Sequence, residues 1–265
     1  MDGVQPLQPP ARRATSSDAP RRRCFRYGNY SGYYGYRVGK TQEDHRLLAL
    51  QAAWFAGRRC LDVGCNEGLV PLTLAVKYHT ASFTGVDIDS SLVARAQSKL
   101  RRLQAAAECA SSSSGTPATA DAAELAAAVP ALAGCAFRQA NFLRLELAPG
   151  SLDTVLCLSV SKWVHLNWGD EGLTTLFARA FAVLAPGGVF ILEPQPWKSY
   201  KAAFKKQRMP ADTLATYRSL ALRPAGFAEL LVGTTGFEKV EELRQAAGSG
   251  FDRPLLCAYK KAADE

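Results

Sequence analysis

The sequence predicts an α/β fold in which a mostly parallel β-sheet is covered by helices on both faces. Short apolar runs alternate with helix-like segments from Leu47 to the end of the chain, as in strands joined by crossover helices. The length of 265 residues suits one large α/β domain. Apolar residues make up 48% and charged residues 21%, a composition that excludes wholesale disorder and disulfide-scaffold folds.

Seven strands are expected from the apolar runs, at residues 60–63, 82–86, 136–139, 154–158, 189–192, 240–243 and 254–259. Gly64 ends the first strand, and the Pro186-Gly187-Gly188 turn precedes the fifth. The last two strands are expected to form an antiparallel edge. In a sheet of this kind the ligand site lies at the carboxyl ends of the strands.

Four helices are expected between and after these strands, at 69–78, 90–103, 170–184 and 224–231. Residues 104–134 contain thirteen alanines, a serine run and no basic residue. They are expected to form a low-complexity insertion, a surface loop with one short helix at 121–129. Residues 1–23, rich in Pro, Arg and Ser, are expected to form a disordered basic arm before a domain at 24–265.

The charge balance favours an anionic partner. The chain carries 32 Lys+Arg against 24 Asp+Glu, a net charge of +8, and nucleic acid is the first candidate. The basic residues concentrate in residues 1–26 and 198–208, and a solvated tail and helix face are the alternative.

Composition also sets the expected surroundings of the protein. No apolar run approaches the ~20 residues that span a bilayer, and the amino terminus lacks the apolar stretch of a secretory signal. The seven cysteines show no paired metal spacing and indicate buried thiols in a reducing compartment. We therefore expect an intracellular protein without membrane contact or a metal site.

A glycine turn follows the first expected strand, in the sequence LDVGCNEG. Gly64 lets the backbone approach a ligand, and the helix from Leu69 points its amide ends there. The next strand ends in GVDIDS, which places Asp87 at its tip. An acid at that point suits the two hydroxyls of an adenosine ribose. The alternative is a helix-capping turn without a ligand.

This arrangement resembles motifs I and II of S-adenosylmethionine-dependent methyltransferases. The resemblance implies a Rossmann-like class I fold with S-adenosylmethionine as the cofactor and S-adenosylhomocysteine as its product. In that superfamily a polar side chain and an apolar neighbour flank the adenine, here Asn141 and Phe142. The implied cofactor residues of the sheet edge are Gly64, Cys65, Asn66, Asp87, Ile88, Asn141, Phe142 and Leu158.

Three longer segments carry a closer resemblance. They are YGNYSGYYGYR at 27–37, LCLSVSKWVHLNWGDEGL at 156–173 and LEPQPWKSY at 192–200. They are similar, in the same order, to the RNA 5′ methylphosphate capping enzymes, the bicoid-interacting methyltransferase family. That family transfers a methyl group from S-adenosylmethionine to an oxygen of the 5′ terminal phosphate of an RNA. The tyrosine-rich segment resembles the branch acting on the γ-phosphate of 7SK- or U6-type small nuclear RNAs, which implies a small non-coding RNA with a 5′ triphosphate as the partner.

The chemistry of this reaction predicts cations at the acceptor. A phosphate oxygen is already anionic at neutral pH, so the transfer needs no general base and depends on positioning and electrostatics. Lys162 and His165 follow the fourth strand and are expected to act as the catalytic contacts to the acceptor. We expect Lys162 to be charged at any relevant pH and His165 to act as a neutral donor.

Aromatic and polar side chains are expected to hold the RNA. Three tryptophans offer planes for stacking the first nucleotide, with core packing as the alternative: Trp163, Trp168, expected in a polar loop, and Trp197. The family resemblance implies that Tyr27 and Arg37 belong to a lid at 24–46 over the cofactor and the phosphate. The other expected RNA contacts are Asn29, Tyr30, Tyr33, Lys162, Asn167, Gln195, Lys198 and Lys201.

Two other functions stay open on the sequence. A methyltransferase acting on 5′ monophosphate RNA is distinguished by comparing triphosphate and monophosphate acceptors. An RNA-binding assembly protein would bind RNA tightly, with slow or no turnover. We expect a monomer, alone or within an RNA–protein complex. The arginines at 21–23 resemble part of a nuclear signal, so a nuclear location is expected.

Overall fold

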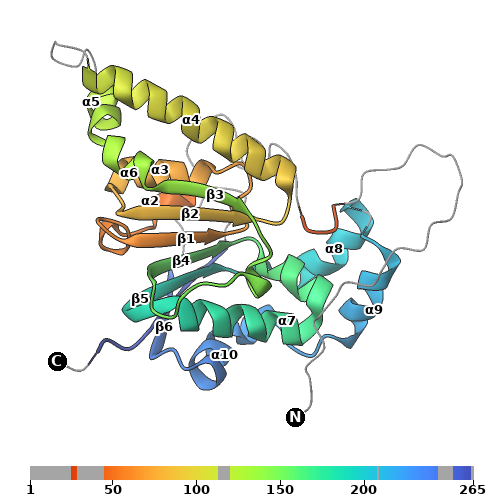
Figure 1. Cartoon of the computed structure of the whole chain (residues 1–265). Helices are drawn as coiled ribbons and strands as arrows, with labels where there is room; N and C mark the ends of the chain where they lie inside the picture. The colour runs from red at the N-terminus through yellow and green to blue at the C-terminus, as the bar shows by residue number, and fades with distance from the viewer. Residues whose placement is uncertain (1–24, 29–44, 113–119, 208, 244–252, 264–265) are drawn as a thin grey trace, which may run out of the picture.

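One seven-stranded sheet forms the centre of the protein. The structure, a computed structural model, describes residues 25–28, 45–112, 120–207, 209–243 and 253–263. The strands are β1 (Arg59–Val63), β2 (Ser82–Asp87), β3 (Cys135–Gln139), β4 (Leu152–Leu158), β5 (Leu184–Glu193), β6 (Lys239–Leu243) and β7 (Leu255–Tyr259). Their order in the sheet is β3-β2-β1-β4-β5-β7-β6 (Figure 1). The strands from β3 to β5 pair in parallel, and β7 is antiparallel to both β5 and β6. The predicted parallel sheet with an antiparallel edge is confirmed.

Helices connect the strands and pack on the sheet. They are α2 (His45–Leu48), α3 (Leu69–Tyr78), α4 (Ser90–Ser112), α5 (Ala120–Ala127), α6 (Val129–Ala133), α7 (Ser161–Val183), α8 (Lys198–Gln207), α9 (Ala211–Ser219) and α10 (Phe227–Leu230). Shorter helical turns are η2 (Ala52–Trp54), η3 (Phe142–Arg144), η4 (Pro224–Gly226) and η5 (Leu231–Thr235). None of the helices in the described part of the chain is long and apolar enough to cross a membrane.

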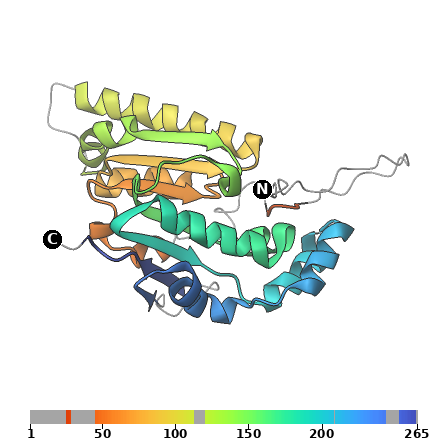
Figure 2. The ribbon, with the colours of Figure 1, turned by 60° about the horizontal axis from the view of Figure 1, so that its bottom comes forward.

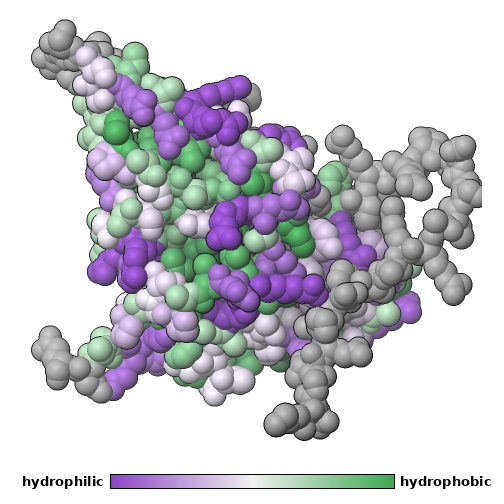
Figure 3. Space-filling model, in the orientation of Figure 1, coloured by the Kyte–Doolittle hydropathy of each residue, from purple (hydrophilic) through white to green (hydrophobic). Residues whose placement is uncertain are grey.

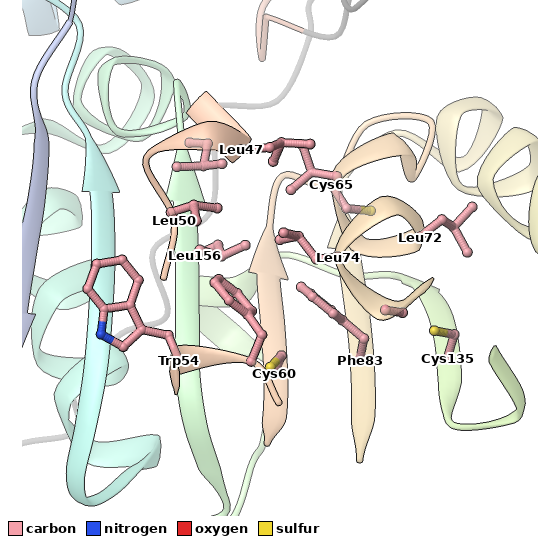
Figure 4. Close-up of a cluster of buried hydrophobic side chains, with 14 of the residues drawn as sticks. Leu47, Leu50, Trp54, Cys60, Cys65, Leu72, Leu74, Phe83, Cys135 and Leu156 are labelled. Atoms are coloured by element: carbon pink, nitrogen blue, oxygen red, sulfur yellow. The ribbon is translucent and has the colours of Figure 1, made fainter. Parts of the chain in front are cut away.

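Both faces of the sheet are buried by apolar clusters. Successive strand residues point to opposite sides, so each strand contributes to both clusters. On β1, Cys60 joins the apolar cluster that includes α3 and α4, while Leu61 joins the cluster that includes α7 and α10. Figure 4 shows the first cluster, where Leu47, Leu50 and Trp54 from the α2–η2 segment pack against the sheet. Packing therefore occupies both faces, and the polar groups of the predicted site gather at the carboxyl ends of the strands.

The segment at 104–134 is mostly helical in its described residues, so the expected surface loop is wrong, whereas the expected short helix at 121–129 matches α5 (Ala120–Ala127). α4 continues to Ser112 instead of ending at 103, and α5 and α6 follow it. Alanine is the best helix former, and an alanine-rich run stays helical when partners cover one side. Here Ala107 is buried, and α5 and α6 contact α4. Hydrophilic side chains gather along the outer face of α4 (Figure 3).

The helix after β4 starts earlier than expected. α7 begins at Ser161 instead of 170, so Trp168 lies in a helix and not in the predicted polar loop. Gly169, with φ 69° and ψ −167°, interrupts the helical backbone, and it kinks α7 there. Two further helices, α8 and α9, lie together beside the start of α7 (Figure 2). α8 corresponds to the helix face that was the alternative for residues 198–208, and α9 was not predicted. The start of α7 is thus packed between the end of β4 and these two helices.

Candidate functional site

The glycine turn lies where β1 ends and α3 begins. Gly64 has a φ of +77°, and a Cβ there would fall 2.3 Å from Val160 Cγ2, so only glycine fits. The N–H groups of Gly64 and Cys65 donate to the carbonyl of Val86 at 2.7 and 3.0 Å, which fixes the turn against β2. Because Val160 connects β4 to α7, the same contact places the start of α7 against the turn.

Asp87 ends β2 beside this turn, as predicted. Its side chain is buried and accepts hydrogen bonds from the backbone N–H groups of Asn66 and Asp89, each at 2.9 Å. Burial raises the pKa of Asp87, and the backbone hydrogen bonds oppose that shift. The two bonds orient the carboxylate at the tip of the strand. A carboxylate oxygen has room for more than one donor, so Asp87 can also accept from a ligand hydroxyl.

Asp62 provides a test of whether the site fits the implied cofactor. It lies on β1 just before the turn, and its Oδ1 atom is buried without a hydrogen-bond partner among the described residues. Burial raises the pKa of Asp62 to about 8, while the positive charge of Arg46 opposes the shift. The Asp62 oxygen without a partner lies behind a turn where Gly64 leaves space. This arrangement fits a ligand that carries hydrogen-bond donors, as the ammonium and hydroxyl groups of S-adenosylmethionine do.

Three predicted cofactor residues have largely buried side chains. Cys65 packs in the core cluster (Figure 4), and burial raises the pKa of its thiol. Its side chain therefore packs in the core, and the backbone of Cys65 lines the turn. Leu158 ends β4 in the same cluster, and Phe142 lies in the opposite one with the guanidinium of Arg179 6.0 Å from its ring centre.

Asn141 and Ile88 stay at the strand ends where the prediction put them. Asn141 is half-buried, and its Oδ1 accepts from the N–H of Leu143 at 3.1 Å, capping the η3 turn after β3. Ile88 follows Asp87 and is also half-buried, and its carbonyl accepts from Gln139 Nε2 at 3.3 Å. Both residues thus lie at the carboxyl ends of β2 and β3, near Asp87.

Lys162 lies in the first turn of α7 with 6% of its surface exposed. Its Nζ is 4.3 Å from the centre of the Trp163 ring, a cation–π contact. Burial lowers the pKa of Lys162 to about 8, with a further contribution from the charge of Arg253. The expectation of a charge at any relevant pH is therefore wrong: the ammonium is charged at pH 7 and loses its proton in the mildly alkaline range.

Gln195 holds the start of α7 instead of facing the RNA. Its Oε1 accepts from the N–H of Lys162 at 3.1 Å and from Ser161 Oγ at 3.3 Å. Its Nε2 donates to the carbonyl of Ser159. Both ends of the amide are therefore engaged, and the predicted RNA contact by Gln195 is replaced by a role in positioning Lys162.

His165 does not reach the acceptor side of the site, which corrects the predicted catalytic contact. The ring has no exposed surface. Its Nδ1 lies 3.2 Å from the hydroxyl of Tyr200, and its Nε2 lies 2.6 Å from Asp170 Oδ1. Burial lowers the pKa of His165, and the neighbouring Asp170 opposes that shift. The kink at Gly169 brings Asp170 back to this ring, and His165 joins α7 to α8.

Residues 25–28 of the predicted lid dock on α7. Tyr27 stacks on Trp168 with ring centres 5.8 Å apart and planes at 14°. Arg26 Nε donates to Asn167 Oδ1 at 2.8 Å, and Asn167 Nδ2 donates to the carbonyl of Arg26 at 3.0 Å. Asn167 thus holds the 25–28 segment, and Tyr27 covers a face of Trp168 that was expected to stack on a nucleotide. The predicted contacts Asn29, Tyr30, Tyr33 and Arg37 lie outside the described residues.

The other two tryptophans also pack within the protein. Trp163 is 6% exposed in the cluster that joins α7 to α8, which is the core-packing alternative. Trp197 is stacked on Tyr217 at 5.3 Å, and the guanidinium of Arg223 lies 4.0 Å from its ring centre. Stacking of a nucleotide on either ring would require these contacts to change. The remaining predicted contacts, Lys198 and Lys201, are exposed on α8.

A buried ion pair was missed by the sequence reasoning. Arg46 Nη1 lies 3.1 Å from Glu193 Oε2, and their side chains are 1% and 0% exposed. Glu193 ends β5, so a charged residue after an apolar strand was the available signal. Arg253 was also missed: its Nη1 donates to Ser159 Oγ at 3.1 Å. No sequence signal identified Arg253, because its neighbour in space, Ser159, follows β4 and lies far from Arg253 along the chain.

Comparisons with known proteins agree with this geometry. The family model for Bicoid-interacting protein 3 (Bin3) matches residues 152–261, and the model for a methyltransferase domain matches residues 61–192. An Arabidopsis thaliana protein named "Probable RNA methyltransferase" is 41% identical, over 89% of this chain and 81% of its own. The human "7SK snRNA methylphosphate capping enzyme" is 36% identical over 90% of this chain, which spans 40% of that enzyme's length. The Drosophila melanogaster "U6 snRNA methylphosphate capping enzyme Amus" is 33% identical, over 94% of this chain and 81% of its own.

A solved structure supports the fold. Phosphoethanolamine N-methyltransferase 2 of Haemonchus contortus, in complex with S-adenosyl-L-methionine, has a TM-score of 0.54 at 16% identity, over 86% of this chain and 56% of that chain. At this level of identity the likeness concerns the fold alone. Together with the strand order, it confirms the predicted Rossmann-like class I fold.

Proposed function

The chain belongs to the Bin3 family and is an S-adenosylmethionine-dependent methyltransferase, and on this premise we propose that it methylates the γ-phosphate at the 5′ end of a small non-coding RNA. The observation that carries the proposal is the placement of Lys162. Lys162 is nearly buried and follows Val160 by two residues in the chain. Val160 in turn lies against the cofactor turn at Gly64. A cation beside a methyl donor suits an anionic acceptor.

The residues present account for the transfer without a general base. Bound S-adenosylmethionine supplies a methyl group on a positively charged sulfur. Asp87 would hold the ribose hydroxyls. Because Gly64 has no side chain, the cofactor could approach the backbone of the turn. Lys162 holds the acceptor so that a phosphate oxygen attacks the methyl carbon. The transfer would form the O–C bond and break the S–C bond, with its electron pair going to sulfur, so no residue of the site would have to take or give a proton.

The choice of the γ-phosphate rests on the named relatives. The 7SK and U6 capping enzymes align with 90% and 94% of this chain, and the tyrosine-rich segment at 27–37 belongs to the same resemblance. The net charge of +8 suits a nucleic-acid acceptor. A phosphorylated small molecule as the acceptor would not account for the exposed lysines Lys198 and Lys201 on α8.

The test is methyl transfer from labelled S-adenosylmethionine to one hairpin RNA prepared with 5′ triphosphate, monophosphate and hydroxyl ends. Label on the triphosphate form alone is expected, and Lys162→Ala should abolish most of it. Label confined to the monophosphate form would move the activity to that branch. Tight RNA binding without any label would indicate the RNA-holding function instead.

A further inference from the structure

Arg253 brings a second cation to the corner of the site that holds Lys162. It precedes β7 by two residues, and β7 runs antiparallel to β5 with Leu256 paired to Leu192. The residues just before β7 therefore lie beyond the carboxyl end of β5. There Arg253 Nη1 donates to Ser159 Oγ at 3.1 Å, three residues before Lys162 in the chain.

A buried network fixes the position of this arginine. Ser159 has a φ of 63° between β4 and α7, and its Oγ donates to Glu193 Oε2. The same Glu193 oxygen accepts from Arg46 Nη1 at 3.1 Å. Hydrogen-bonded chains of this kind are strong in a low-dielectric interior. Arg253 is thus attached to an ion pair that is itself fully buried.

The charge of Arg253 acts on Lys162. Arg46 and Glu193 form an ion pair within the buried network. Lys162 and Arg253 bring two positive groups to the same corner of the site. Their proximity is reflected in the pKa of Lys162, which the charge of Arg253 lowers in addition to burial. Two like charges brought together repel, and an anion that contacts both relieves the repulsion.

We propose that Arg253 and Lys162 together bind the terminal phosphate of the acceptor, with Arg253 as a second phosphate contact; this inference rests on the proposed function. A guanidinium binds phosphate through a planar fork and an ammonium as a point charge. The attacking oxygen loses negative charge during the transfer. Both cations therefore stabilise the bound acceptor before the reaction at least as strongly as they stabilise the transition state. Arg253 therefore acts on the KM for RNA more than on kcat.

The experiment compares the wild type with Arg253→Ala, Arg253→Lys and the matched control Arg58→Ala, an exposed arginine at the amino end of β1. RNA affinity is measured in the presence of S-adenosylhomocysteine. The same hairpin RNA is prepared in two forms, one with a 5′ triphosphate and one with a 5′ hydroxyl. We expect the wild type and Arg58→Ala to prefer the triphosphate end and Arg253→Ala to lose about 10- to 100-fold of that preference. In methyl transfer, the KM for RNA should rise by a similar factor while kcat stays within about threefold.

Several outcomes would overturn the inference. One is an end preference in Arg253→Ala that matches Arg58→Ala. Another is weaker binding of S-adenosylmethionine with an unchanged KM for RNA, because Arg253 would then serve the cofactor. If Arg253→Ala unfolds, Arg253→Lys decides, since it keeps the charge but loses the fork and should still raise the KM about threefold. Wild-type protein that prefers the triphosphate end without methylating it would refute the proposed function and leave the phosphate site standing.

Discussion

The two sides of the site differ in charge and in how their residues are brought together. The cofactor side, formed by Asp62, Gly64, Asn66 and Asp87, uses acids and backbone donors from the ends of β1 and β2. The acceptor side, formed by Arg46, Ser159, Lys162, Glu193 and Arg253, uses cations around one buried ion pair. Each side has the charge opposite to that of its proposed ligand, a sulfonium cofactor and a phosphate.

The distance along the chain differs as strongly as the charge. Cofactor-side residues come from two adjacent strands and the turn between β1 and α3. Acceptor-side residues come from segments as far apart as residues 46 and 253. The comparison teaches that a cofactor turn is a local structure, whereas the proposed phosphate contacts require the last strand to be paired in the sheet.

The largest expected effect follows from cutting the ion pair of the acceptor side. Arg46→Ala removes the guanidinium that pairs with the buried Glu193 carboxylate, and the free energy of unfolding should fall by about 3–5 kcal/mol. The matched control is Arg59→Ala, which removes an exposed pair with Asp153 and should cost at most about 1 kcal/mol. Denaturant unfolding of both variants measures the difference. Equal losses would show that the buried pair is not what holds the acceptor side together.

On the cofactor side, Asp87→Ala should weaken S-adenosylmethionine binding about 100-fold. The carboxylate is expected to accept from two ribose hydroxyls, at roughly 1.5 kcal/mol for each charged hydrogen bond. Calorimetric titration measures the affinity, and Asp121→Ala, which removes an exposed acid on α5, is the control. RNA binding should stay close to the wild type. A folded Asp87→Ala protein with unchanged cofactor affinity would remove Asp87 from the site.

The pH dependence of the acceptor side should follow Lys162. Because burial lowers the pKa of Lys162 to about 8, the ammonium loses its proton as pH rises through that value. The KM for RNA should therefore rise about tenfold between pH 7 and pH 9, while the RNA phosphates stay ionised, with a second pKa of about 6 for a phosphate monoester.

Lys162→Arg is the control for this profile, since an arginine keeps its charge across the range. It should flatten the rise in the KM for RNA. The pKa of Asp62 is also about 8, so the KM for S-adenosylmethionine is measured in the same series. A wild-type KM for RNA that stays flat to pH 9.5 would contradict the assignment of the profile to Lys162.

The smallest expected effect concerns the docking of the 25–28 segment on α7. Tyr27→Leu removes the stack on Trp168, an interaction worth about 0.5–1.5 kcal/mol. The kcat/KM for RNA should fall by a few-fold, and Tyr27→Phe, which keeps the ring, should stay near the wild type. If both substitutions lower kcat/KM equally, the hydroxyl and not the stack is what matters.

The fold and the cofactor side could be predicted because they depend on local patterns. Strand and helix alternation led to the sheet, and the glycine turn with Asp87 led to the cofactor. The errors fell where neighbours in space decide the outcome. The 104–134 segment is mostly helical because α5 and α6 pack on α4, and Trp168 lies in a helix that Gly169 kinks but does not end.

The sequence by itself determined the fold class, the cofactor turn and the presence of Lys162 at the start of the segment after β4. Only the tertiary structure decided which polar side chains have partners within the protein. Gln195 and His165 hydrogen-bond to partners within the protein, whereas Arg253 is brought to Ser159 from the segment just before β7. The physical reason is that a turn is specified by the residues within it, while the partner of a buried polar group is set by packing between segments that lie far apart in the chain.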